Sequence, residues 1–95
     1  MIGLDTSVLA RYFTQDDPAQ SRKANELMER RLTEDDPGFV SLVTMAETVW
    51  VLGSVYALSD LEIVSAVERM LQADVLVIQN KQEVFTASVA LKSGR

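Results

Sequence analysis

The sequence predicts an α/β fold in which a short parallel sheet carries helices on its faces. Three short apolar runs fit buried strands, at residues 2–4, 39–42 and 75–78. Between and after these runs, apolar residues recur at helical spacing, which gives the element order β-α-α-β-α-α-β-α. Strands that alternate with helices pair in parallel through right-handed crossovers, so helices are expected to cover the sheet.

The first two helices are indicated by apolar spacing and by a start signal. The first is expected directly after the first strand, with Val8, Leu9, Tyr12 and Phe13 on one face. Asp17 followed by Pro18 fits an N-cap with proline at the first helical position. The apolar residues of this second helix recur at i, i+3, i+4 and i+8: Ala24, Leu27, Met28 and Leu32.

Three further helices are expected in the second half of the chain. One runs from about Met45 to Tyr56, the next begins at Ser59 with Glu62 as its capping partner, and the last begins at a box formed by Asn80 and Glu83. Their core-facing residues are expected to be Val49, Trp50, Leu52 and Val55, then Ile63, Val67, Met70 and Leu71, then Val84, Phe85, Ala87 and Leu91.

Composition narrows the chemistry that the chain can perform. Its 95 residues suit one domain spanning 1–95, and an apolar content of 47% argues against disorder. Cysteine and histidine are both absent, which excludes thiolate ligands and a histidine base and leaves oxygen ligands, suited to Mg²⁺ or Mn²⁺. The net charge of −5 predicts weak non-specific attraction to nucleic acid, although a bound cation can bridge acidic residues to a phosphate.

The longest apolar stretch, residues 39–56, is nearly long enough to be a membrane-spanning helix. Serine, threonine and the charged Glu47 interrupt it, so a strand followed by a core helix explains it better than a membrane helix. The N-terminus lacks a basic region followed by an apolar run, the pattern of a signal peptide. A cytoplasmic location without membrane association is therefore expected.

Two carboxylates are expected at one edge of the sheet. Asp5 ends the first apolar run, and Glu47 follows the second. Ligands of open α/β sheets bind at the carboxyl ends of the strands, so these two acids form a candidate divalent-metal site. Each acid has an alternative role: Asp5 also fits an N-cap, and Glu47 also fits the last position of a capping box that begins at Thr44.

Small polar residues follow the same strand ends. Thr6 and Ser7 are placed to donate hydrogen bonds to Asp5 or to a phosphate, or simply to start a helix. Ser41 and Asn80 are expected at the same edge, where a capping role competes with a ligand role for each of them.

The opening of the chain, MIGLDTSVL at 1–9 with YFTQDDP at 12–18, and a second segment, SLVTMAETVWVL at 41–52, resemble motifs of a known family, the PIN domains. They look most like the VapC-type toxins of bacterial toxin–antitoxin pairs. The second segment is similar to a family motif in which a glutamate follows the second strand. The resemblance covers essentially the whole chain and implies a three-layer α/β/α arrangement.

What the resemblance implies is a Mg²⁺- or Mn²⁺-dependent endoribonuclease in which a metal-activated water hydrolyses RNA phosphodiesters. Asp5 matches the first family acid, Glu47 the second, and Ser7 the small polar residue that helps to orient the water of the metal. Family members often form homodimers, and the toxins are inhibited by an antitoxin protein whose tail lies across the active-site groove.

The resemblance also implies an incomplete domain. A third family acid is expected after a segment like residues 90–95, and a further strand follows it. The chain is therefore expected to be a single PIN-like domain that lacks its C-terminal third and ends after the third strand and its following helix. Two functions stay open: the ribonuclease, and a non-catalytic remnant that dimerises or binds an antitoxin-like partner.

Overall fold

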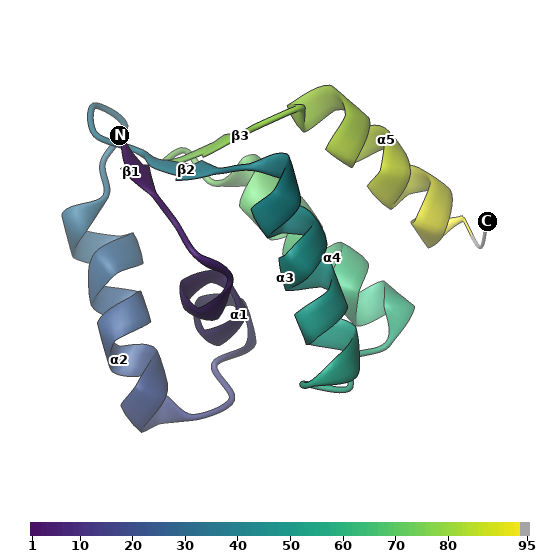
Figure 1. Cartoon of the computed structure of the whole chain (residues 1–95), viewed down its shortest axis with the longest axis horizontal. Helices are drawn as coiled ribbons and strands as arrows, with labels where there is room; N and C mark the ends of the chain where they lie inside the picture. Colours follow the sequence, from purple (N-terminus) through teal and green to yellow (C-terminus); the bar gives the residue numbers. More distant parts are fainter. Residues whose placement is uncertain (94–95) are drawn as a thin grey trace.

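The computed structural model describes residues 1–93, and its central feature is a three-stranded parallel sheet (Figure 1). The strands are β1 (Ile2–Gly3), β2 (Gly38–Val40) and β3 (Leu76–Ile78), in the order β1-β2-β3. Gly3 pairs with Phe39, and Phe39 pairs with Val77. The predicted parallel sheet is confirmed, and because β2 is central, β1 and β3 are its two edges within the described residues.

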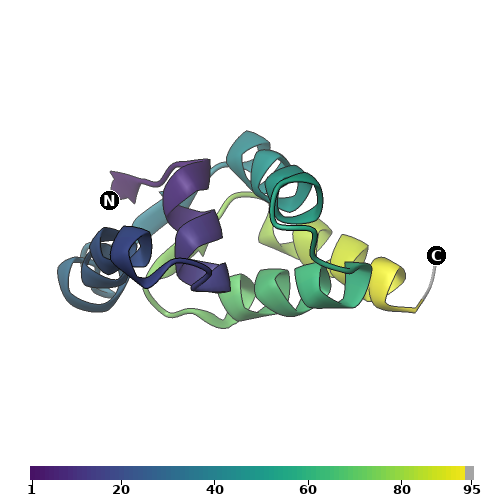
Figure 2. The ribbon, with the colours of Figure 1, turned by 90° about the horizontal axis from the view of Figure 1, so that it is seen from below.

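The helices follow the predicted order. They are α1 (Thr6–Thr14), α2 (Pro18–Glu26) with a π-helical continuation at Leu27–Arg31, α3 (Leu42–Ser54), α4 (Asp60–Gln72) and α5 (Lys81–Lys92). The molecule measures 37 × 28 × 18 Å, and Figures 1 and 2 show α2 and α5 at opposite ends of its longest axis. The helix α3 packs against both α1 and α4. The α/β class predicted from the sequence is confirmed.

The core is built from every layer of the fold. Leu9 of α1, Val40 of β2, Leu52 of α3 and Met70 of α4 are each fully buried. Burial of such side chains contributes about 1.5–3 kcal/mol each relative to exposure. These residues fix the helices against one another and against β2 and β3.

Four residues predicted to face the core are instead exposed: Trp50 of α3, Val55 just after it, and Phe85 and Ala87 of α5. In α3 the buried residues are Met45, Thr48 and Leu52. Trp50 is two positions from both Thr48 and Leu52, and at about 100° per residue that spacing places it on the opposite face of the helix. The prediction was wrong because the apolar content of α3 exceeds what one buried face requires.

The helix caps are partly as predicted. Asp17 caps α2 by accepting the backbone N–H groups of Ala19 and Gln20. By contrast, the box predicted at Asn80 and Glu83 is wrong. Asn80 has a left-handed backbone with φ of 55° and makes no side-chain cap bond. A capping side chain reaches the first turn from an extended backbone, and the left-handed conformation of Asn80 does not provide that geometry.

Replacing Glu62 by alanine is expected to lower the midpoint of thermal unfolding at neutral pH. In the confirmed capping box of α4, the Glu62 carboxylate accepts the backbone N–H of Ser59 at 2.9 Å. Hydrogen bonds from the Ser59 backbone and side chain hold the pKa of Glu62 below its ordinary value of 4.5. A depressed pKa stabilises the fold above the unfolded-state pKa, and this contribution is lost as pH falls through the folded-state pKa.

The effect of Glu62→Ala should therefore shrink in acid. Circular dichroism melts of wild type and variant, at neutral pH and again below the folded-state pKa of Glu62, provide the check. A loss of equal size at both pH values would show that the charge of the carboxylate does not contribute.

The apolar stretch at residues 39–56 forms parts of β2 and α3 and the turn after them, so the prediction of a strand followed by a helix is confirmed. Among residues 1–93, every helix is too short or too polar to traverse a bilayer.

Candidate functional site

Asp5 is the last residue before α1 and caps the N-terminus of that helix. Its backbone is extended, and its Oδ1 accepts the backbone N–H of Val8 at 2.9 Å. The side chain is exposed, and Oδ2 receives no hydrogen bond from the described part of the chain. The capping role considered for Asp5 is therefore real, but it uses one carboxylate oxygen and leaves the other accessible to a ligand.

Glu47 lies in the second turn of α3, with an exposed side chain. The capping box expected from Thr44 to Glu47 is wrong. The N-cap is Ser41, whose Oγ accepts the backbone N–H of Thr44 at 3.1 Å. Because α3 begins three residues earlier than predicted, Thr44 is already inside the helix and its N–H is satisfied. The Glu47 carboxylate forms no hydrogen bond or ion pair with residues 1–93, so both of its oxygens are accessible.

Helical spacing places Glu47 on the flank of α3 that faces α1. The opposite flank points toward α4 and α5, where Met45 and Val49 line an apolar groove. At about 100° per residue, Thr44 and Glu47 lie on the other side of the helix from these residues. α3 packs against α1 as well as α4, so the flank of α3 that carries Glu47 is the one facing α1, the helix that Asp5 caps.

The starts of α1 and α3 lie at the same edge of the sheet. The backbone N–H of Leu4 bonds to the carbonyl of Phe39 at 2.9 Å, and extending this parallel register brings Asp5 level with Ser41. Adjacent strands are about 4.8 Å apart. We call the predicted site residues at and just beyond this edge the rim: Asp5 and Ser7 at the start of α1, and Ser41 and Glu47 at the cap and in the second turn of α3.

The two serines of the rim differ in what they leave unbonded. Ser7 is exposed in the first turn of α1, and its hydroxyl has no hydrogen-bond partner among the described residues. The Ser41 hydroxyl both accepts the N–H of Thr44 and donates to the hydroxyl of Thr44 at 3.0 Å. Of the two roles considered for Ser41, cap and ligand, the structure shows the cap. The role of Ser7 in orienting a metal-bound water stays a prediction.

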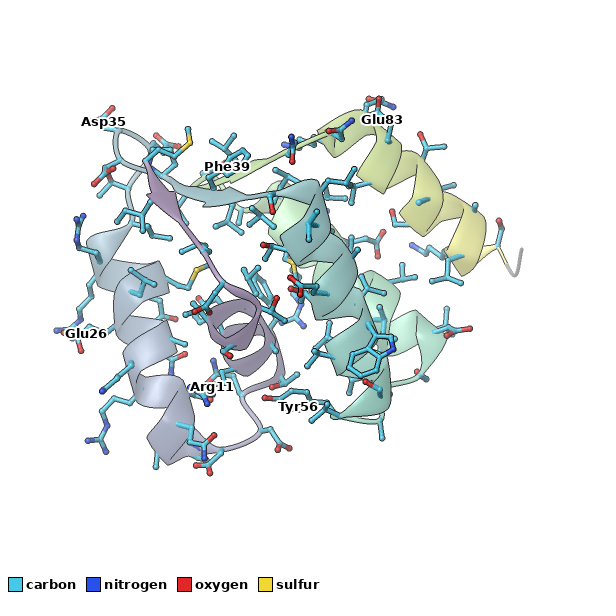
Figure 3. All side chains as sticks on the ribbon, viewed as in Figure 1. Arg11, Glu26, Asp35, Phe39, Tyr56 and Glu83 are labelled. Atoms are coloured by element: carbon cyan, nitrogen blue, oxygen red, sulfur yellow. The ribbon has the colours of Figure 1, made fainter. Side chains whose placement is uncertain are left out.

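Other charged residues have partners or positions away from the rim. Figure 3 shows Asp35 in the loop before β2, at the opposite end of that strand from α3. Its neighbour Asp36 pairs with the terminal ammonium of Met1 at 2.8 Å and with Arg31 at 3.0 Å. Arg11 lies near Tyr56 (Figure 3), and both line a small cavity with residues that follow α1. Asp35, Asp36 and Arg11 are therefore not counted among the residues of the candidate site.

A search against family models matched residues 2–94 to the PIN domain. This chain belongs to the PIN domain family. The match spans nearly the whole sequence, so the resemblance seen in the two sequence segments is confirmed at the level of the family. Searches of curated proteins and of solved structures gave no match. The family assignment means that the chain has a nuclease-type fold.

The donor atoms at the rim of this PIN domain suit a hard divalent cation. Asp5 offers Oδ2 and Glu47 offers two oxygens, and carboxylate oxygen is the ligand type that Mg²⁺ and Mn²⁺ prefer. No three acidic side chains within residues 1–93 are placed to share one metal ion. Mg²⁺ is commonly held by one or two carboxylates together with substrate phosphates and water. The residues present therefore fit such a cation in a substrate-assisted site.

Gln79 is a residue of this edge that sequence reasoning missed. It follows β3, and its Oε1 accepts the backbone N–H of Leu42, the first residue of α3, at 2.8 Å. Its own backbone N–H donates to the carbonyl of Val40 at 2.9 Å. Gln79 and Leu42 are 37 positions apart in the chain. Because no periodic or capping pattern links residues so distant, the sequence carries no signal for this contact.

An apolar groove of about 270 Å³ lies between α3, α4 and α5 of the PIN domain. Its lining includes Met45, Val49, Ile63, Val67, Val84 and Leu91, and Glu83 at the start of α5 adds a charged side chain (Figure 3). Leu42 also lines the groove and is 44% exposed. Because the groove is on the flank of α3 away from Glu47, it is separate from the rim.

Proposed function

We propose that this PIN domain is a Mg²⁺- or Mn²⁺-dependent endoribonuclease of the VapC toxin type. The observation that carries the proposal is the placement of two exposed acids on neighbouring helices that start at one sheet edge: Asp5 at the cap of α1 and Glu47 on the α1-facing flank of α3. Both acids retain carboxylate oxygens that no described residue engages. The family assignment supports phosphodiester hydrolysis as the reaction class.

Each rim residue has a distinct part in this proposal. When bound, the cation activates a water and stabilises negative charge on the phosphodiester. Asp5 would hold it through Oδ2, while the N–H of Val8 fixes the other oxygen and so the orientation of the carboxylate. Glu47 would supply the second ligand, and the Ser7 hydroxyl would orient the attacking water. The N-terminal end of α1 adds the positive end of its dipole, which favours a phosphate oxygen nearby.

Replacing Glu47 by glutamine is expected to lower the rate of Mg²⁺-dependent RNA cleavage by at least about tenfold. Mutating residues that only support a metal ligand already lowers activity by that much, and Glu47 would be a ligand itself. Cleavage of a labelled single-stranded RNA, with Mg²⁺ and with a chelator, measures the effect. Glu83→Gln provides the control, because Glu83 is also an exposed acid early in a helix but belongs to the groove. Equal rates for all three proteins would count against the proposal.

A second candidate function, partner binding without catalysis, is favoured by the apolar groove between α3, α4 and α5. Its lining is almost wholly apolar, and three of its apolar residues are exposed: Leu42, Ala46 and Ala87. Contiguous exposed apolar surface typically marks a protein interface. The partners proposed are a second copy of the chain and an antitoxin-like protein, and the location proposed for the complex is the cytoplasm.

Replacing Leu42 by aspartate is expected to weaken self-association by at least about tenfold, because an interface would bury the new carboxylate without a partner. Sedimentation velocity over a series of protein concentrations measures it. Val55→Asp is the matched control, as Val55 is a 66% exposed residue just beyond the other end of α3. A wild-type chain that sediments as a monomer at every concentration would exclude the homodimer.

A further inference from the structure

We propose that Gln79 is a positioning residue for the rim, which fixes the start of α3 and through it the carboxylate of Glu47. The proposal rests on the proposed function of the rim, since it concerns how one of its two acids is held. It assigns a role at this site to β3, a strand that contributes no acid to it.

The contacts of Gln79 enclose the turn that leads from β2 into α3. Its backbone N–H donates to the carbonyl of Val40 at 2.9 Å, and its side-chain Oε1 accepts the N–H of Leu42 at 2.8 Å. Val40 and Leu42 are the two neighbours of Ser41, the N-cap of the helix. One glutamine therefore holds the chain on both sides of the N-cap of α3.

The start of α3 depends on this contact because its first N–H groups have no acceptor within the helix. Ser41 satisfies the N–H of Thr44, and Gln79 satisfies the N–H of Leu42. At the start of α1, by comparison, Asp5 makes the side-chain cap bond from within its own segment. The direction in which α3 leaves the sheet is thus set jointly by β2 and β3.

Glu47 follows Ser41 by six positions on the same helix, so its place relative to Asp5 is determined by where and at what angle α3 begins. Losing the Gln79 contact would free the first turn and let the Glu47 carboxylate shift. Misplacement of a reacting group by about 1 Å can cost about a hundredfold in rate. The free side-chain nitrogen of Gln79 is a hydrogen-bond donor and does not ligate a cation, so we assign its effect to Glu47.

The test compares Gln79→Met, which keeps the length but removes the acceptor, with Gln79→Glu, which keeps an oxygen at that position. Calorimetric titration with Mn²⁺ measures affinity, and hydrogen exchange of the backbone amides at 42–47 measures order in the first turns of α3. We expect Gln79→Met to raise the Mn²⁺ Kd about tenfold, the usual effect of removing a residue that supports a metal ligand from outside. We also expect faster hydrogen exchange of the amides at 42–47. Gln79→Glu should keep both near the wild-type values.

Ser59→Ala is the control, because it removes an N-cap of the same kind from α4, a helix that carries neither rim acid. It should lower the melting temperature without changing the Mn²⁺ Kd. Wild-type exchange rates at 42–47 in Gln79→Met would overturn the positioning role, and so would an equal rise in Kd for Ser59→Ala. Faster exchange in Gln79→Met, with no Mn²⁺ binding by the wild type, would instead reject the proposed metal site and leave Gln79 as an anchor of α3 alone.

Discussion

Replacing Leu52 by alanine is expected to destabilise the fold by about 2–5 kcal/mol, which is the usual cost of removing a buried leucine side chain and leaving a cavity. Leu52 is fully buried in α3, and its carbonyl also accepts the N–H of Leu58 in the turn toward α4. The total stability of small domains is about 5–15 kcal/mol, so this single change removes a large share of it. Urea unfolding followed by circular dichroism measures the difference.

Leu61→Ala is the matched control for this prediction. Leu61 is also a helical leucine, in the first turn of α4, but its side chain is 65% exposed. Its removal should change the free energy of unfolding by no more than about 0.5 kcal/mol. If both variants lost the same stability, the core assigned to the contact between α1, α3 and α4 would be incorrect.

Replacing Asp5 by asparagine is expected to raise the Mn²⁺ Kd by at least about a hundredfold while leaving the fold intact. Asparagine caps helices about as well as aspartate, so the hydrogen bond from Val8 is retained and α1 still begins at residue 6. What is lost is the negative charge and the second carboxylate oxygen. A direct ligand should matter at least as much as the outer contacts that cost about 10–100-fold. Calorimetry measures the affinity, and circular dichroism verifies folding.

Asp17→Asn shows whether the effect belongs to the rim or to net charge. Asp17 caps α2 through the N–H groups of Ala19 and Gln20, in the same way that Asp5 caps α1. The substitution removes one negative charge from an N-cap on a different helix. It should leave Mn²⁺ affinity unchanged, and an equal loss in both variants would mean that the cation responds only to the overall charge of the protein.

The fold could be predicted to the extent that its signals are local. The order of strands and helices follows from apolar spacing, and the caps at Asp17 and Ser59 follow from residues within one turn of them. The start of α3 could not be chosen locally, because Ser41 and Thr44 both fit an N-cap. The choice depends on where β2 ends, and that is fixed by its pairing with β1 and β3.

In the candidate site, too, features with a local sequence signal could be predicted, and features set by distant contacts could not. Asp5 and Glu47 could be proposed from the sequence because each follows an apolar run, and strand ends are where such sites form. The correct first residue of α3 came only from the structure, and with it the finding that Glu47 is not part of a capping box. The contribution of Gln79 depends on the sheet bringing β3 beside the start of α3, which no local pattern encodes. Exposure of Trp50 likewise depends on which face of α3 packs against α1 and α4.

The central position of β2 has a consequence for the order in which the molecule folds. Ile2 pairs with Gly38, which follows it by 36 residues, and Gly38 pairs with Leu76, a further 38 residues along. Every strand pairing therefore closes a long loop, and contacts so distant in the chain slow folding. During synthesis β1 has no partner until β2 has been made, so α1 and α2 leave the ribosome before any strand pair can form. The β1–β2 loop brings Asp5 level with Ser41, whereas the β2–β3 loop brings Gln79 to Leu42, so both loops must close before the start of α3 has all its contacts beside Asp5.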